Sequence, residues 1–201
     1  MSISVGVIAE DVRFQRFLEP AILALAQEHG LDVQIASTEK TGGCRPRTLQ
    51  RMVRSAAECD LLVVGADASG LGHARRTLTF RQKAKQMRPL LEPDHDRCSL
   101  AIAAPSVEAW LICDAGSFAG GLERALGTAF AMPERWPIPR TEREAKTMLG
   151  SLLKQGTGDT LPLAGFEFAQ EIVPQMPLEG SGSPSLSDWA RGFVRLMRQV
   201  P

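Results

Sequence analysis

The fold class is decided by residues 60–67, which read DLLVVGAD. Between the two aspartates stands an unbroken run of Leu, Val and small residues. Such a run predicts a strand that is buried on both faces, as in parallel sheets covered by helices on both sides. Asp67 places a carboxylate where this strand ends. The segment therefore predicts the central strand of a parallel sheet with a polar group at its carboxyl end.

Similar apolar runs and helical patterns lie on either side of this segment. Further strands are predicted over residues 3–9, 31–36 and 100–105. Apolar residues spaced three and four apart predict helices over residues 14–25, 49–56 and 107–113, and a basic helix is predicted over 75–87. Strands that alternate with helices form βαβ units, whose right-handed crossovers build a parallel sheet. We therefore expect an α/β, Rossmann-like fold of about four mainly parallel strands flanked by helices.

The character of the chain changes after residue 115. Residues 116–201 are irregular and rich in Gly and Pro, with helical patterns over 141–153 and 185–200. We interpret residues 1–115 as an α/β core and residues 116–201 as a small helical extension that packs on it.

Composition excludes several classes of protein. Lys+Arg and Asp+Glu both number 23, so a globally basic nucleic-acid binder is excluded, although a local basic patch is not. No window reaches the roughly 18–20 apolar residues of a membrane span. The first residues lack the basic start of a secretory signal. A cytoplasmic protein that does not enter membranes is expected.

Three acids follow predicted strands. Glu10 comes after the first strand, Asp67 ends the third, and Glu108 lies just beyond the fourth. Because the carboxyl ends of parallel strands share one edge of a sheet, these carboxylates are expected to lie together. Clustered carboxylates share a proton or bind a hard cation, and Mg²⁺ or Mn²⁺ suits oxygen ligands. We predict that all three bind metal and act in catalysis; the alternative is that each acid caps a following helix.

Three segments resemble the TOPRIM fold of topoisomerases, primases and related nucleases. They are the start Val7–Asp11, the turn Asp67–Gly70, and the segment Pro105–Asp114, which reads PSVEAWLICD. The chain looks most like TOPRIM-like bacterial proteins of unknown function that are often linked to ATPases in defence loci, and the likeness spans most of its length. In the TOPRIM family a Glu follows the first strand and an Asp-x-Asp pair follows the third.

The resemblance implies a metal-dependent nuclease that cleaves nucleic-acid phosphodiesters, as the effector of a bacterial anti-phage system with a partner ATPase. The chain has no tyrosine, so it cannot itself form a tyrosyl–DNA intermediate. It departs from the family at Asp11, where Gly is usual, at residues 12–14, which supply no second acid, and at Ser69, which replaces the second Asp. These departures keep an alternative open: a non-catalytic subunit that binds the ATPase.

Basic residues near the acids are candidates for contacts with a phosphate backbone. They are Lys40 and Arg45 in a Gly-containing loop over residues 40–47, and Arg75, Arg76, Arg81 and Lys85 after the Asp67 turn. The alternative is a helix face that is simply solvated. The residues do not distinguish DNA from RNA, and homo-oligomerisation is left open.

Overall fold

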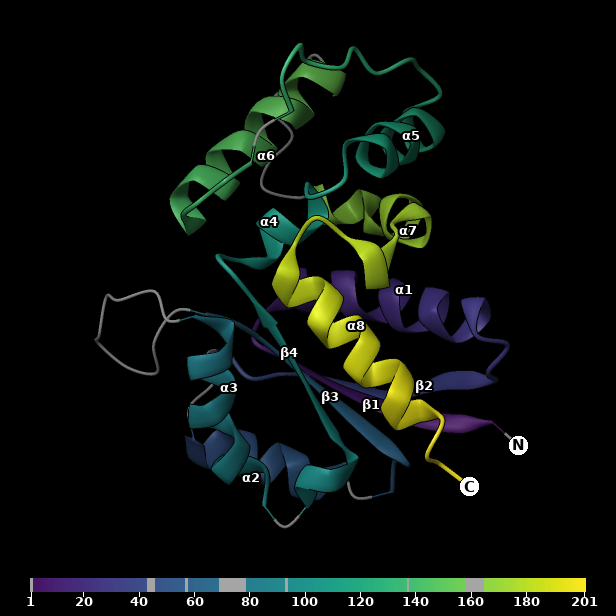
Figure 1. Ribbon diagram of the computed structural model, residues 1–201, viewed down its shortest axis with the longest axis vertical. Coiled ribbons are helices and arrows are strands. Elements are labelled where there is room, and N and C mark those ends of the chain that lie inside the picture. Colours follow the sequence, from purple (N-terminus) through teal and green to yellow (C-terminus); the bar gives the residue numbers. More distant parts are fainter. Residues whose placement is uncertain are drawn as a thin grey trace.

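The computed structural model describes residues 2–42, 46–56, 58–68, 79–92, 94–136, 138–157 and 165–201. A four-stranded sheet in the order β2-β1-β3-β4 forms its centre (Figure 1). The strands are β1 (Ile3–Ala9), β2 (Val33–Lys40), β3 (Leu61–Asp67) and β4 (Cys98–Ala103). Every neighbouring pair is parallel, which confirms the predicted α/β class with about four parallel strands.

Helices flank the sheet and make up most of the C-terminal third. They are α1 (Val12–Glu28), α2 (Pro46–Ser55), α3 (Phe80–Met87), α4 (Val107–Leu111), α5 (Ala115–Leu126), α6 (Glu142–Thr157), α7 (Ala169–Ile172) and α8 (Pro184–Met197). Short 3-10 turns cover Arg88–Leu91, Asp94–Arg97, Gly165–Phe168, Val173–Gln175 and Leu178–Gly180. None of the helices in the described part of the chain combines the length and apolarity that a membrane crossing needs.

Alternate residues of the central strands enter two separate cores. Val63 of β3 packs with α1 and with helices of the C-terminal third, whereas Val64 packs with α2 and the end of α3. Burial on both faces explains why residues 61–66 are apolar without alternation. The unbroken apolar run of β3 is therefore explained by the helices that cover both faces of the sheet.

Gly65 allows α1 to lie close to β3. A Cβ atom at this position would stand 2.6 Å from Leu18 Cδ1 and 2.7 Å from Phe14 Cδ1. Both α1 side chains are fully buried. The missing side chain thus sets the distance between β3 and the helix that begins beside Glu10.

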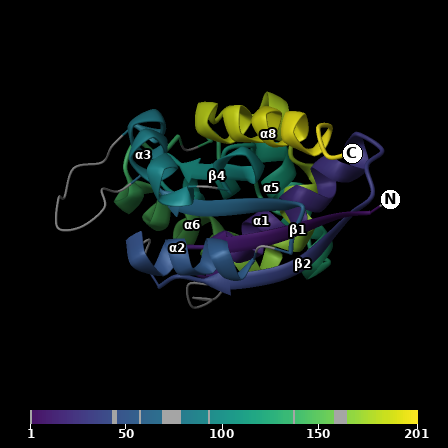
Figure 2. The same ribbon diagram turned by 90° about the horizontal axis from the view of Figure 1, so that it is seen from below.

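The C-terminal helix α8 joins the same core as α1 and lies alongside β4 (Figure 2). Trp189 of α8 stacks on Trp110 of α4, with ring centroids 6.0 Å apart. Ser185 Oγ accepts hydrogen bonds from Trp110 Nε1 at 2.8 Å and from Ala104 N at 3.2 Å. The first turn of α8 is thereby fastened to both α4 and the end of β4.

Several boundaries differ from expectation by a few residues, and two of the differences concern the predicted basic residues. Lys40 is the last residue of β2 and not part of a loop, because it pairs with Ala9 at the end of β1. The basic helix begins at Phe80, where Thr79 closes a capping box with Gln82. The part of its predicted range before residue 79 lies outside the described residues.

Candidate functional site

The structure brings Glu10, Asp67 and Glu108 to one edge of the sheet. Glu10 directly follows β1, Asp67 ends β3, and Glu108 lies in the first turn of α4 after β4. Asp67 N donates a hydrogen bond to Glu10 Oε2 at 3.0 Å, and Asp67 Oδ1 accepts one from the backbone N–H of Val107, the neighbour of Glu108, at 2.9 Å. The predicted placement of the three acids at the ends of neighbouring strands is therefore observed.

Asp67 is held in an environment that disfavours its charge. Burial, followed by the nearby charges of Glu108 and Glu10, raises the pKa of Asp67 to about 8, although the hydrogen bond from Val107 N opposes the shift. At neutral pH this carboxyl therefore keeps its proton while the protein binds no cation. A cation at the same edge would favour the ionised form and release that proton.

Glu108 is almost fully buried, at 2 % exposure. Its Oε1 accepts a hydrogen bond from Arg13 Nη1 at 2.7 Å. Its Oε2 is buried without a hydrogen-bond partner among the described residues. A buried carboxylate oxygen left unpaired is costly, so this atom is a ligand position open to a cation or a donor.

Arg13 is a site residue that sequence reasoning did not identify. Its Nε and Nη2 donate to Asp11 Oδ2 at 2.8 and 2.6 Å, while Nη1 reaches Glu108. Asp11 in turn caps α1 by accepting from the backbone N–H groups of Arg13 and Phe14. Burial opposes the guanidinium charge, but the bond to Asp11 and the charge of Glu108 outweigh it and raise the pKa of Arg13. The Arg13 guanidinium thus forms ion pairs with two acids at this edge of the sheet, Asp11 and Glu108.

Helix α6 supplies a second cation, Lys146, which was also not predicted. Burial opposes its charge, but the hydrogen bond to Glu142 and the charge of Glu108 raise the pKa of Lys146. A cavity of about 230 Å³ opens between α6 and the acids. Its lining combines charged side chains with an apolar wall: Arg13, Glu108, Lys146, Leu149, Gly150, Leu153 and Phe166. Of the three acids, Glu108 is the one that lines this cavity.

The predicted basic residues are only partly placed. Lys40 is exposed at the carboxyl end of β2, and Arg81 and Lys85 are exposed on α3. Arg81 lies 3.7 Å from Asp188 of α8 and over the ring of Phe80. The remaining candidates, Arg45, Arg75 and Arg76, lie outside the described residues.

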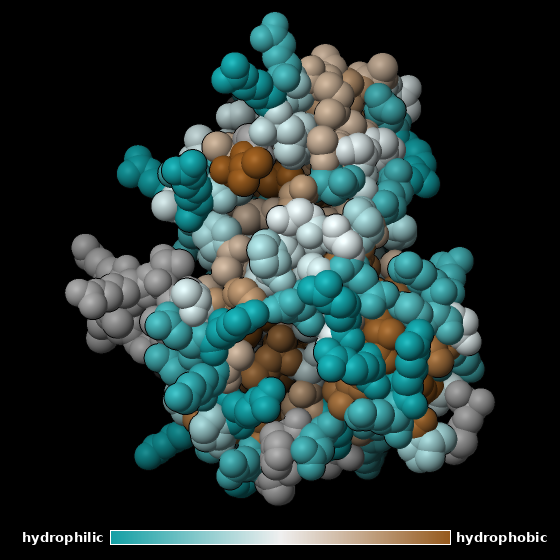
Figure 3. Space-filling model, viewed as in Figure 1, coloured by the Kyte–Doolittle hydropathy of each residue, from teal (hydrophilic) through white to brown (hydrophobic). Residues whose placement is uncertain are grey.

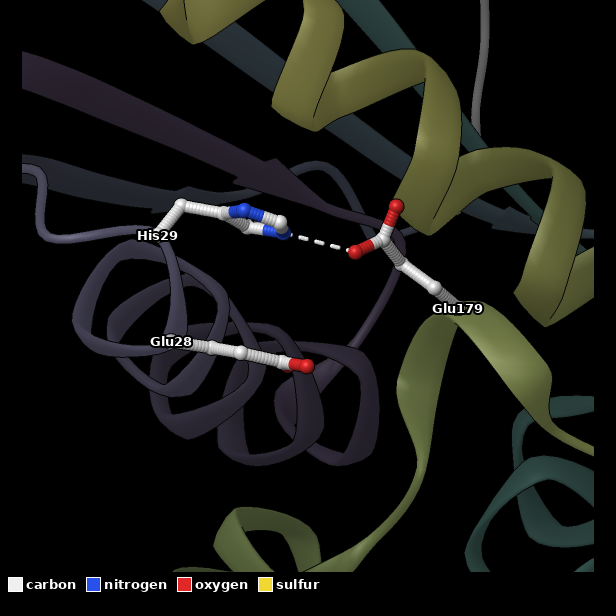
Figure 4. A group of neighbouring side chains, drawn as sticks. All are labelled: Glu28, His29 and Glu179. Atoms are coloured by element: carbon white, nitrogen blue, oxygen red, sulfur yellow. Dashed lines mark hydrogen bonds and ion pairs between the residues drawn. The ribbon is translucent and has the colours of Figure 1, made fainter.

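A different cluster comes closest to the spacing of metal ligands. Within the described residues, Glu28, His29 and Glu179 each place one ligand atom within 4.8 Å of the others (Figure 4); Glu10, Asp67 and Glu108 are more widely spaced. His29 Nε2 lies 2.6 Å from Glu179 Oε1, and His29 Nδ1 lies 2.9 Å from Arg198 Nη2.

The contacts of His29 fix its role. An arginine can only donate, so Nδ1 accepts and Nε2 carries the proton given to Glu179. Both ring nitrogens are therefore occupied, and the cluster ties the end of α1 to the turn before α8 and to the end of α8. His29 is therefore a structural residue that joins these three segments.

Comparison with known proteins adds no relative. A scan against models of protein families, a search of curated proteins and a search of solved structures each gave no match.

Proposed function

We propose that the edge formed by Glu10, Asp67 and Glu108 binds Mg²⁺ or Mn²⁺ in a TOPRIM-like domain that hydrolyses nucleic-acid phosphodiesters, as the effector of an anti-phage system. The observation that carries this proposal is the meeting of three carboxyl groups at the ends of adjacent strands, close enough for two of them to raise the pKa of the third. The resemblance of the Val7–Asp11 and Pro105–Asp114 segments to TOPRIM-like proteins supports it.

The donor set fits a hard cation. Glu108 offers an unpartnered Oε2 while Arg13 holds its Oε1, so the carboxylate is already oriented. Asp67 has one oxygen bonded to Val107 N and can give up its proton. Binding of one ion by all three acids requires the carboxyl groups to draw closer together than they lie here. A bound Mg²⁺ would neutralise phosphate charge and make a bound water more acidic.

The chain's own residues have defined parts in this proposal. Glu10, Asp67 and Glu108 are the oxygen ligands. Arg13 is a positioning residue because it acts through Glu108. Lys146 stands at the cavity mouth with a partly exposed ammonium group, where it can meet a phosphate oxygen.

Calorimetric titration with Mn²⁺ tests the metal site. Wild type should bind saturably, and Glu10→Ala, Asp67→Asn and Glu108→Gln should each weaken binding at least tenfold. Asp32→Asn is the matched control, because Asp32 is exposed and precedes β2 at the opposite end of the sheet. Since Asp67 holds a proton at neutral pH, binding at pH 7 should release protons, which repeated titrations in two buffers of different ionisation enthalpy detect.

A nuclease assay then tests the reaction. Single- and double-stranded DNA and RNA are incubated with Mg²⁺, and cleavage should be lost in Glu10→Ala and retained in Asp32→Asn. Absence of both Mn²⁺ binding and cleavage in the wild type would argue against a catalytic site in the isolated chain.

The ion pair between Arg13 and Glu108 favours a second candidate function. The Arg13 guanidinium neutralises Glu108 without a metal ion. This arrangement is compatible with a non-catalytic subunit that has the TOPRIM-like fold and binds a partner ATPase. This alternative predicts that co-purification with the ATPase survives Glu10→Ala and Asp67→Asn. Loss of the complex in both folded variants would argue against it.

A further inference from the structure

A groove runs along the outer edge of β4, away from the carboxylate edge. It has a volume of about 430 Å³, and residues of β4 form its floor, including Leu100 and Ile102. Helix α3 stands on one side of β4 and α8 on the other (Figure 1). In the same view, the molecular surface shows apolar side chains at the bottom of a hollow between hydrophilic ridges (Figure 3).

The edge of β4 is open to pairing. The sheet order places β4 at one end, and no described strand pairs with its outer side. The N–H and C=O groups on such a side accept an added strand. Residues of β4 alternate between its two sides: Ala103 O accepts from Ala68 N on the β3 side, so Leu100 and Ile102 present their N–H and C=O groups to the outer side.

Gly192 leaves space in the wall of this groove. It lies within α8, lines the groove, and a Cβ atom placed on it would have no neighbour within 4 Å. A glycine inside a helix costs about 1 kcal/mol relative to alanine. No contact in the described part of the chain requires the missing side chain, so the space beside Gly192 is open to an occupant of the groove.

Trp189 contributes an aromatic side chain to the same wall. It stands one helical turn before Gly192, lines the groove and is only 4 % exposed. Its Nε1 is itself buried, so Trp189 offers an occupant apolar contact with its ring.

The charges at the groove define the kind of occupant. Arg81 and Arg88 line it from the α3 side, and Asp188 and Asp96 balance them. Arg81 and Asp188 approach to 3.7 Å, but the Arg81 side chain is 81 % exposed, so this contact is weak and can open. Balanced charges over an apolar floor favour a segment with little net charge.

Helices α3 and α8, which flank β4, also limit the size of a partner that can pair with this strand. Pairing of β4 with β4 of a second copy would bring the second copy's α3 and α8 to the same edge. One extended segment entering between the helices avoids this crowding.

We propose that this groove binds one extended, mainly apolar peptide segment of a partner protein, which adds to β4 as a fifth strand. The proposal is independent of the metal site.

Selection from a displayed library of random decapeptides tests it. The library is selected on wild type with counter-selection on Gly192→Phe, whose ring would fill the groove. Enriched peptides are expected to alternate apolar residues, to bind wild type in the micromolar range, and to bind Gly192→Phe at least tenfold more weakly. Gly192→Ala and Ser151→Phe, which adds the same ring on the exposed face of α6, should bind within about twofold of wild type.

Backbone methylation separates strand addition from simple apolar contact. Alternate N–H groups of an added strand face β4, so N-methylation of one alternate set should abolish binding and that of the other set should not. Thermal melts establish that Gly192→Phe is folded. The proposal is overturned if no enriched peptide distinguishes wild type from Gly192→Phe, or if both methylated sets bind equally. It is also overturned if wild type sediments as a dimer and Gly192→Phe as a monomer, because the groove then belongs to a second copy.

Discussion

Among the single residues, Glu108 has the surroundings that are least usual for its type. A buried glutamate keeps its charge only when it is paired and hydrogen-bonded. Here one oxygen is paired with Arg13 and the other has no hydrogen-bond partner in the described chain. The ion pair with Arg13 therefore offsets part of the cost of burying this carboxylate.

Removal of the guanidinium should be costly. Arg13→Met leaves Glu108 buried with an uncompensated charge, and we expect the free energy of unfolding to fall by about 3 kcal/mol. Urea unfolding measures the change. The control is Arg16→Met, which removes an exposed arginine of the same helix and should cost no more than about 0.5 kcal/mol. Equal effects of the two substitutions would show that Arg13 does not hold Glu108.

The raised pKa of Asp67 predicts a dependence of stability on pH. The folded protein binds a proton with a pKa of about 8, whereas the unfolded chain releases it near 3.8. This contribution to stability is complete below pH 3.8 and is lost as pH rises through 8. Asp67→Asn mimics the protonated form, so in EDTA it should match wild type near pH 4 and exceed it by about 1–3 kcal/mol at pH 8.5. A stability difference that does not change with pH would contradict the assignment.

Sequence predicted the acids of the site but not its cations. Glu10, Asp67 and Glu108 were predictable because each follows a strand and parallel strands end at one edge. Arg13 and Lys146 lie on helices, where a charged residue usually faces water. Their partners depend on how α1 and α6 dock onto α4, which no local pattern encodes.

Among the elements, the packing of α1 on β3 depends on Gly65. A side chain there would press on Leu18 and Phe14, both fully buried. We expect Gly65→Ala to lower the free energy of unfolding by about 1–3 kcal/mol. Gly150→Ala, at an open position within α6, should instead raise it by about 0.5–1 kcal/mol. Urea unfolding of the two variants provides the comparison, and a neutral Gly65→Ala would mean that α1 adjusts without cost.

Element type was more predictable than element boundaries. Strand β3 is buried on both faces, and its apolar run marks both of its ends to within a residue. Strand β2 is an edge strand with part of each face exposed, and its last residues, Thr38 to Lys40, are polar. Only pairing with β1 makes them a strand, so their sequence indicated a loop.

For the whole molecule, the hydroxyl group of Ser185 adds hydrogen bonds to the apolar packing that holds α8 on the sheet. Ser185→Ala removes the acceptor used by Trp110 Nε1 and Ala104 N and leaves buried donors unpaired. We expect a loss of about 1–3 kcal/mol in the free energy of unfolding. Ser151→Ala on the exposed face of α6 should change it by no more than about 0.5 kcal/mol. A small effect of Ser185→Ala in thermal or urea unfolding would show that stacking of Trp110 on Trp189 suffices.

The overall class could be predicted because alternation of strands and helices restricts the connections to right-handed crossovers. The order of the strands could not, since the same alternation permits several orders. That order determines which acids become neighbours. It also leaves β4 as an edge with an open groove, a feature with no counterpart in the sequence pattern.

The bridge made by Arg13 has a consequence for how the protein is made. Domains built around a metal often stay unfolded until the ion arrives. Here a built-in guanidinium already balances Asp11 and Glu108, so we expect the chain to reach its native state without an ion. Expression in metal-depleted medium should yield folded protein whose melting temperature EDTA does not lower. Under the proposed function, the cation would then bind to a protein that is already folded.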